Sequence, residues 1–106
     1  MNKEISILYL PQTMSSLEIA KLTGKDHPKV TANIRRIIEE VGIEASGFRI
    51  PSKMPSGQWA DVFFLPYRET QLVISSYSAK RRLAIIDRWQ ELEASKNRAN
   101  IGSYCG

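Results

Sequence analysis

Two short helical patterns separated by a glycine, within residues 16–42, constrain the fold of this chain more than any other feature. Ser16 is predicted to be the N-cap of the first helix, because its hydroxyl can accept a backbone N–H of the first turn. The apolar positions of this helix recur at helical spacing and are Leu17, Ile19, Ala20 and Leu22. Gly24 suits the left-handed conformation that often follows a helix, so a short helix is expected to end just before it.

The second helical pattern begins at Asp26, a predicted N-cap, and has Pro28 in its first turn, where a missing N–H costs nothing. It runs to about Val41 and ends at Gly42. A stripe about 100° wide holds its apolar side chains, which are Val30, Ile34, Ile37, Ile38 and Val41. Two helices joined by a short turn that contains glycine predict a helix-turn-helix motif.

The side of the second helix opposite this stripe is polar and mostly basic. It carries Lys29, Ala32, Asn33 and Arg36, and Lys25 lies in the preceding turn. Lysine and arginine neutralise phosphates and can donate to guanine, and asparagine can make a bidentate contact with adenine. Glu39 and Glu40 follow at the far end, where they would repel DNA. We therefore expect the N-terminal half of the helix to enter a DNA groove; the alternative is a solvated basic face on an ordinary amphipathic helix.

The single histidine, His27, stands at the start of the second helix. It could bond a phosphate with the help of the helix N-terminus, or it could cap the helix or face solvent, and the sequence leaves both open. The single cysteine, Cys105, lies near the end of the sequence, so neither an internal disulfide nor a Cys–His pair is expected. The sequence holds no metal-ligand pair, phosphate loop or recognisable catalytic constellation, and we expect neither a cofactor nor an enzymatic activity.

The remaining patterns place strands and two further helices around this motif. They are a strand at residues 4–10, a linker at 11–15, strands at Phe48–Ile50 and Trp59–Leu65, and helices at Arg68–Ser76 and from Ala79 to about Ala94. The two later strands indicate a β-hairpin, which the first strand could extend to a three-stranded sheet. The predicted fold is α+β, a winged helix-turn-helix with a short β-hairpin wing and two C-terminal helices. We expect one domain over residues 1–95 and a flexible tail over 96–106.

Basic and aromatic residues mark the predicted hairpin. Arg49 and Lys53 could contact phosphates, or they could be edge-strand charges that discourage aggregation. Trp59, Phe63 and Phe64 could form a platform on which bases stack. Strand alternation puts Trp59 and Phe63 on one face and Phe64 on the other, so core packing is expected for most of them.

The last predicted helix has a second basic cluster, formed by Lys80, Arg81, Arg82 and Arg88. This cluster is either a further phosphate contact or a solvated face. Glu91 is placed to pair with Arg88 at a spacing of three residues. Trp89 and its apolar neighbours could form the seam of a homodimer, since small DNA-binding domains often need two copies.

The net charge of the chain is +4, which suits a polyanionic partner but also describes many soluble proteins. No run approaches the roughly 20 apolar residues of a membrane span, and the first residues lack the pattern of a signal peptide. We therefore expect a cytoplasmic protein with no membrane partner.

Two stretches of the chain resemble a known family. Residues 17–42, LEIAKLTGKDHPKVTANIRRIIEEVG, resemble the opening of the phage regulatory protein Rha family and of related phage antirepressor N-terminal modules. The shared pattern IA-x-x-x-GK-x-H-x-x-V-x-x-x-IR is matched by Ile19, Ala20, Gly24, Lys25, His27, Val30, Ile34 and Arg35. Residues 65–93 resemble the second half of the same module. The hairpin departs from the family, because residues 57–61 read GQWAD where Gly-Arg-x-x-Pro is frequent.

The resemblance implies a phage or prophage regulator and points to Lys25 and His27 as functional. The first candidate function is a transcription regulator that binds double-stranded DNA in the bacterial host cell, close to the nucleoid. The residues predicted to contact DNA are Lys25, His27, Lys29, Asn33, Arg36, Arg49 and Lys53. The alternative is an antirepressor that binds and inactivates a phage repressor protein.

Overall fold

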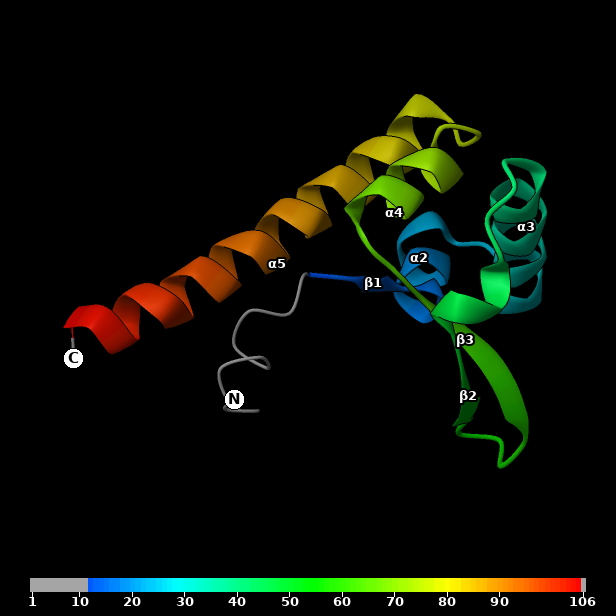
Figure 1. Cartoon of the computed structure of the whole chain (residues 1–106), viewed down its shortest axis with the longest axis horizontal. Helices are drawn as coiled ribbons and strands as arrows, with labels where there is room; N and C mark the ends of the chain where they lie inside the picture. Colours follow the sequence, from blue (N-terminus) through cyan, green and yellow to red (C-terminus); the bar gives the residue numbers. More distant parts are fainter. Residues whose placement is uncertain (1–11, 106) are drawn as a thin grey trace.

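The structure is a computed structural model that describes the backbone of residues 12–105 and the side chains of residues 12–96. Its elements, shown in Figure 1, are β1 (Met14–Ser15), α2 (Ser16–Thr23), α3 (His27–Glu40), the 3-10 helix η1 (Ala45–Phe48), β2 (Arg49–Lys53), β3 (Trp59–Leu65), α4 (Tyr67–Ile74) and α5 (Ala79–Cys105). This architecture confirms the predicted α+β class, with a β-hairpin after the first two helices and two helices after the hairpin. We call residues 49–65 the wing.

The sheet has three antiparallel strands in the order β1-β3-β2. Met14 pairs with Leu65 and Ser15 with Phe64. The strand predicted at residues 4–10 lies outside the described residues, and the linker predicted at 11–15 was wrong in its last two residues. A two-residue strand has no alternation to detect; Met14 joins the sheet here because its side chain is buried in the core.

The N-cap of α2 is Ser15 and not Ser16, which corrects the prediction by one residue. The Ser15 hydroxyl accepts the backbone N–H of Glu18 at 3.1 Å, as an N-cap does. Ser16 is instead fully buried. The helix ends as predicted, because Gly24 adopts φ 70° and ψ 17°, a conformation that a residue with a Cβ rarely takes.

Helix α3 ends at Glu40, with Val41 as its C-cap and Gly42 turning the chain at φ 84°. Its buried residues, Val30, Ile34 and Ile38, come from the predicted apolar stripe. Val41 does not, because the chain leaves the helix at this residue and its side chain is 53% exposed. Asp26 holds the N-cap position, but its side chain makes no capping hydrogen bond.

Three later boundaries also differ from the prediction. Phe48 closes η1, so β2 begins at Arg49 and extends to Lys53. Helix α4 spans Tyr67–Ile74, about one residue earlier at its start and two at its end. Helix α5 continues to Cys105, well beyond the predicted end near Ala94, because no proline interrupts the residues that follow. The division into a domain at 1–95 and a tail at 96–106 stays a prediction.

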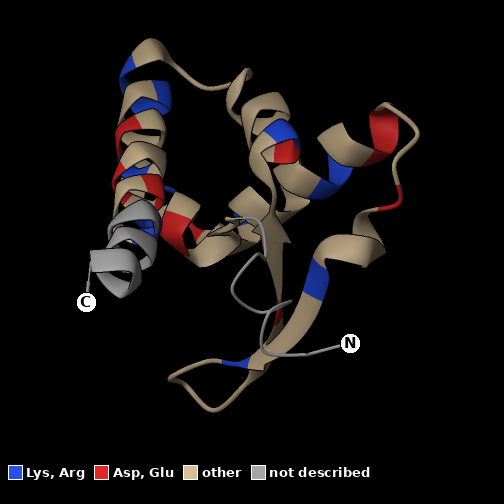
Figure 2. Ribbon diagram, turned by 60° about the vertical axis from the view of Figure 1, so that its left-hand side comes forward, with Lys and Arg blue, Asp and Glu red and all other residues tan. Residues whose placement is uncertain are grey.

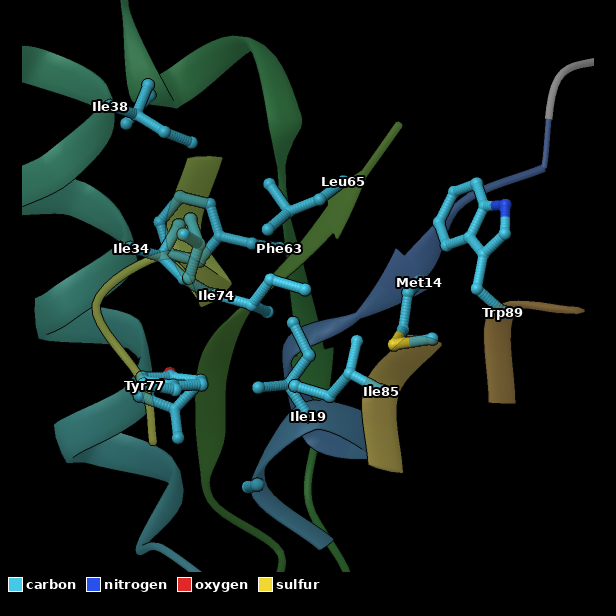
Figure 3. Packing of buried hydrophobic residues seen from close by; sticks show 14 residues of the cluster. Met14, Ile19, Ile34, Ile38, Phe63, Leu65, Ile74, Tyr77, Ile85 and Trp89 are labelled. Atoms are coloured by element: carbon cyan, nitrogen blue, oxygen red, sulfur yellow. The ribbon is translucent and has the colours of Figure 1, made fainter. Parts of the chain in front are cut away.

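One hydrophobic core joins all of these elements except β2 (Figure 3). Phe63 of β3 is fully buried and points toward Ile34 of α3, while Met14, Ile85 and Trp89 fill the space between the sheet and α5. Trp89 also meets the ring of Tyr67 edge-on, with centroids 5.5 Å apart. Helix α2 packs against both α3 and α5. No helix among the described residues is long and apolar enough to cross a membrane.

Candidate nucleic-acid interface

The core holds α3 by one side and leaves its polar side outward. Lys29, Ala32 and Arg36 are exposed on that outer side. The helix is also supported at both flanks. On one flank the Asn33 amide donates to the Ser76 hydroxyl in the α4–α5 turn, and on the other the Arg35 guanidinium lies 3.8 Å from the Asp61 carboxylate in the wing. These contacts add to the packing of Val30, Ile34 and Ile38 in the core, which determines which side chains of α3 face outward.

The start of α3 is tied to α2 and to the sheet through one hydroxyl. Ser16 Oγ accepts the backbone N–H of Phe63 at 3.0 Å and lies 2.8 Å from His27 Nε2. Burial lowers the pKa of His27, which favours the neutral imidazole, whose Nε2 can accept a hydrogen bond from the Ser16 hydroxyl. The structure therefore places His27 against α2, with one ring nitrogen engaged inside the protein. Its predicted phosphate contact stays a prediction.

A hollow of about 190 Å³ lies between α3 and the α4–α5 turn. We call it the basic hollow, and the residues that line it are Lys25, Lys29, Asn33, Arg36, Ser76 and Tyr77. Four of the seven residues predicted to contact DNA are thus brought together. Ser76 and Tyr77 were missed, because they are separated from α3 by about 40 residues and no local pattern connects them.

A chain of hydrogen bonds crosses one wall of the basic hollow. The Arg36 guanidinium donates to Asn33 Oδ1 at 2.7 Å, Asn33 Nδ2 donates to Ser76 Oγ at 3.4 Å, and Ser76 Oγ donates to the Val73 carbonyl at 2.9 Å. Arg36 also lies 3.7 Å from Glu40, but both side chains are well exposed, so this ion pair contributes little. Both polar ends of the Asn33 amide are therefore engaged.

Tyr77 lines the basic hollow and also belongs to the hydrophobic core. Its ring is apolar, whereas its hydroxyl is polar. The side chain is 8% exposed, and the hydroxyl is buried with no hydrogen-bond partner. Burial raises the pKa of Tyr77, and the nearby Asn33 and Arg81 side chains partly offset this rise. Lys25 Nζ lies 5.6 Å from the centre of the ring, a distance at which a cation is attracted to an aromatic face.

The two basic residues predicted in the wing have different surroundings. Arg49 lies 3.6 Å from Asp61, which it shares with Arg35, so its charge is partly compensated. Lys53 is exposed at the end of β2, opposite Trp59 in the register of the hairpin. Arg49 pairs with Phe63 and Lys53 with Trp59, so the two basic residues lie at opposite ends of β2. Neither residue lines the basic hollow.

A family model for the phage regulatory protein Rha matches residues 14–94. The chain belongs to the phage regulatory protein Rha family. The match begins at β1 and ends within α5, so it includes α3, the wing and the α4–α5 turn. Comparison with curated proteins and with solved structures gave no significant match. Family membership gives the protein a role in phage regulation.

The aromatic residues of the wing divide between core and surface. Phe63 is fully buried and Phe64 partly buried, as expected for core packing. Trp59 is the exception among the three, because its side chain is 69% exposed. The reason is its position: Trp59 is the first residue of β3, at the distal end of the wing, where the sheet has extended beyond the elements that cover it.

Two members of the second basic cluster, on α5, have partners within the protein. Arg81 donates to the Thr23 carbonyl at 3.1 Å, which joins the start of α5 to the end of α2. Arg88 pairs with Glu18 and, as predicted, with Glu91 at 3.0 Å; both carboxylates raise the pKa of Arg88. Figure 2 shows basic residues together at the start of α5 and acidic residues further along it. Among the described residues, no group of His, Cys, Asp and Glu side chains is arranged to hold a metal ion.

Proposed function

We propose that this protein is a phage transcription regulator that binds double-stranded DNA, with the N-terminal half of α3 in the major groove. The observation that carries the proposal is the gathering of Lys25, Lys29 and Arg36 around one hollow that no carboxylate lines. An α-helix fits the major groove, and cations at its exposed side neutralise phosphates and release counterions. Glu39 and Glu40 lie at the other end of α3, which leaves the first turns to face DNA.

The support of α3 at both flanks favours this function over a merely solvated basic face. A recognition helix must present its side chains in one fixed orientation, because base contacts depend on hydrogen-bond geometry. Ser76 on one side and Asp61 on the other hold α3 in this way. Lys53 is exposed at the end of β2, opposite the first residue of β3, and we expect it to contact the DNA backbone.

Charge reversal at one lysine tests the proposal. Duplex DNA selected from a random pool is titrated with the wild-type protein, Lys29→Glu and Lys21→Glu, each at several salt concentrations. Both variants change the net charge equally, but Lys21 lies on α2, outside the basic hollow. We expect Lys29→Glu to weaken binding by at least about tenfold and to flatten the salt dependence, while Lys21→Glu changes affinity little.

Two outcomes would overturn the proposal. Equal losses from the two variants would mean that only net charge attracts DNA. Absence of salt-dependent duplex binding by the wild-type protein would favour the antirepressor alternative, in which the partner is a phage repressor protein. A stable complex between purified protein and purified repressor would then be the observation to seek.

A further inference from the structure

We propose that the basic hollow is a binding site for a single phosphate group, and that Asn33 is a positioning residue in it rather than a reader of adenine. The inference rests on the proposed function and assigns it one specific contact. It differs from the expectation drawn from the sequence, in which Asn33 is free to meet a base edge.

The charges around the hollow select an oxyanion. Lys25, Lys29 and Arg36 line it, and none of its lining residues is acidic. Lysine and arginine side chains that converge on one concave site attract a phosphate more strongly than the same charges spread over a convex surface, because the hollow lets them approach the same oxygens. Lys25 comes from the α2–α3 turn, and Lys29 and Arg36 come from positions two helical turns apart on α3, so the helix-turn-helix segment builds this side of the site.

Asn33 is occupied in the wall of the hollow. Its Oδ1 accepts from Arg36 and its Nδ2 donates to Ser76. A bidentate contact with adenine uses the same two atoms, one as acceptor and one as donor, so it would require both bonds to break. In the bonds it makes, Asn33 instead fixes the Arg36 guanidinium at the rim and joins α3 to the α4–α5 turn.

Tyr77 supplies an independent observation that points to a ligand. Its hydroxyl is buried without a partner, which is unusual because buried polar groups are nearly always hydrogen-bonded. Tyr77 and Asn33 both line the hollow. A phosphate oxygen seated in the hollow is the acceptor that this hydroxyl lacks.

Inorganic phosphate tests the site directly. The wild-type protein is titrated with phosphate and, at equal ionic strength, with chloride, while the NMR signals of Ser76 and Tyr77 are followed. We expect saturable shifts with phosphate alone. They should disappear in Arg36→Ala and weaken by about tenfold in Tyr77→Phe, which keeps the ring and removes the hydroxyl. Shifts that are linear, or equal in the two salts, would overturn the site.

Duplex DNA then identifies the source of the phosphate. Duplexes selected from a random pool are made with one uncharged methylphosphonate at a time. If a backbone phosphate occupies the hollow, the methylphosphonate at one position should weaken DNA binding by the wild-type protein. The same methylphosphonate should cause no further loss of affinity in Tyr77→Phe. If free phosphate binds but no position behaves in this way, the site takes a free phosphate group. Failure of duplex binding with intact phosphate binding would reject the proposed function and keep the site.

Discussion

Ser16 Oγ lies 2.8 Å from His27 Nε2, so the first residue of α2 contacts the first residue of α3. The same oxygen accepts the N–H of Phe63 from β3. One buried hydroxyl thus joins the two helices of the motif to the sheet. Because α3 begins at His27, this contact sets the position of the helix end that is proposed to face DNA.

Replacing this hydroxyl should destabilise the fold. In Ser16→Ala the buried Phe63 N–H loses its acceptor, and we expect the free energy of unfolding to fall by about 1–3 kcal/mol. Urea denaturation measures the change. Ser46→Ala, at an exposed position in η1, is the control and should stay within about 0.5 kcal/mol of the wild type. Equal stability of the two variants would show that the Ser16 bonds do not matter.

Stability should depend on pH through His27. Burial lowers its pKa in the folded state, so the unfolded chain, with an ordinary pKa near 6.5, binds the proton more readily. The contribution of His27 to the free energy of unfolding is therefore complete above pH 6.5, and it is lost as the pH falls through the lower folded-state pKa. Denaturation at pH 5, 6, 7 and 8 should show this decline in the wild type and a flatter profile in His27→Gln. Parallel profiles would rule the effect out.

The two tryptophans should differ sharply in how much they contribute to the free energy of unfolding. Trp89 is 6% exposed and packs edge-on against Tyr67, and its indole N–H donates to Glu93 at 3.1 Å. We expect Trp89→Ala to lower the free energy of unfolding by about 3–5 kcal/mol. Trp59→Ala removes an exposed side chain at the end of the wing and should change it by less than about 0.5 kcal/mol. Thermal unfolding of both variants, followed by circular dichroism, compares them; a large loss in Trp59→Ala would contradict its exposed position.

Asn33→Ala separates positioning from base reading. The substitution releases Arg36 but leaves a good helix former on α3, so the fold should persist. If Asn33 positions Arg36, the affinity of Asn33→Ala should be lower than that of the wild type by a similar factor on every duplex. The set contains the selected duplex and duplexes in which one adenine at a time is exchanged for another base. A reader of adenine would instead lose its preference at one base pair, by about 1–3 kcal/mol. Fluorescence anisotropy at constant salt across this duplex set distinguishes the two.

Local patterns in the sequence predict the parts of this fold that rest on neighbouring residues. The spacing of Val30, Ile34 and Ile38 correctly identifies the buried side of α3, and Gly24 correctly ends α2. The exposure of Trp59 could not be predicted in this way, because alternation gives a face of the sheet but not how far the covering elements extend.

The candidate site shows the same limit. Its cations are visible as one polar side of a helical pattern, since they lie within twelve residues of one another. Ser76 and Tyr77 reach the hollow only because α4 packs beside α3, a contact between distant segments. Likewise, the sequence shows Asn33 as a free amide, and only the bonds to Arg36 and Ser76 reveal that it is engaged.

The attachment of α3 at its inner side and its two flanks has a consequence for how this family can diversify. Lys29 and Ala32 point outward and belong to neither the core nor the flanking contacts with Ser76 and Asp61. Substitutions at these two positions would cost little folding free energy, while they change the chemistry that a groove meets. Under the proposed function, a phage lineage could redirect the protein to a new operator by exchanging an outward side chain such as Ala32, with the rest of the domain preserved.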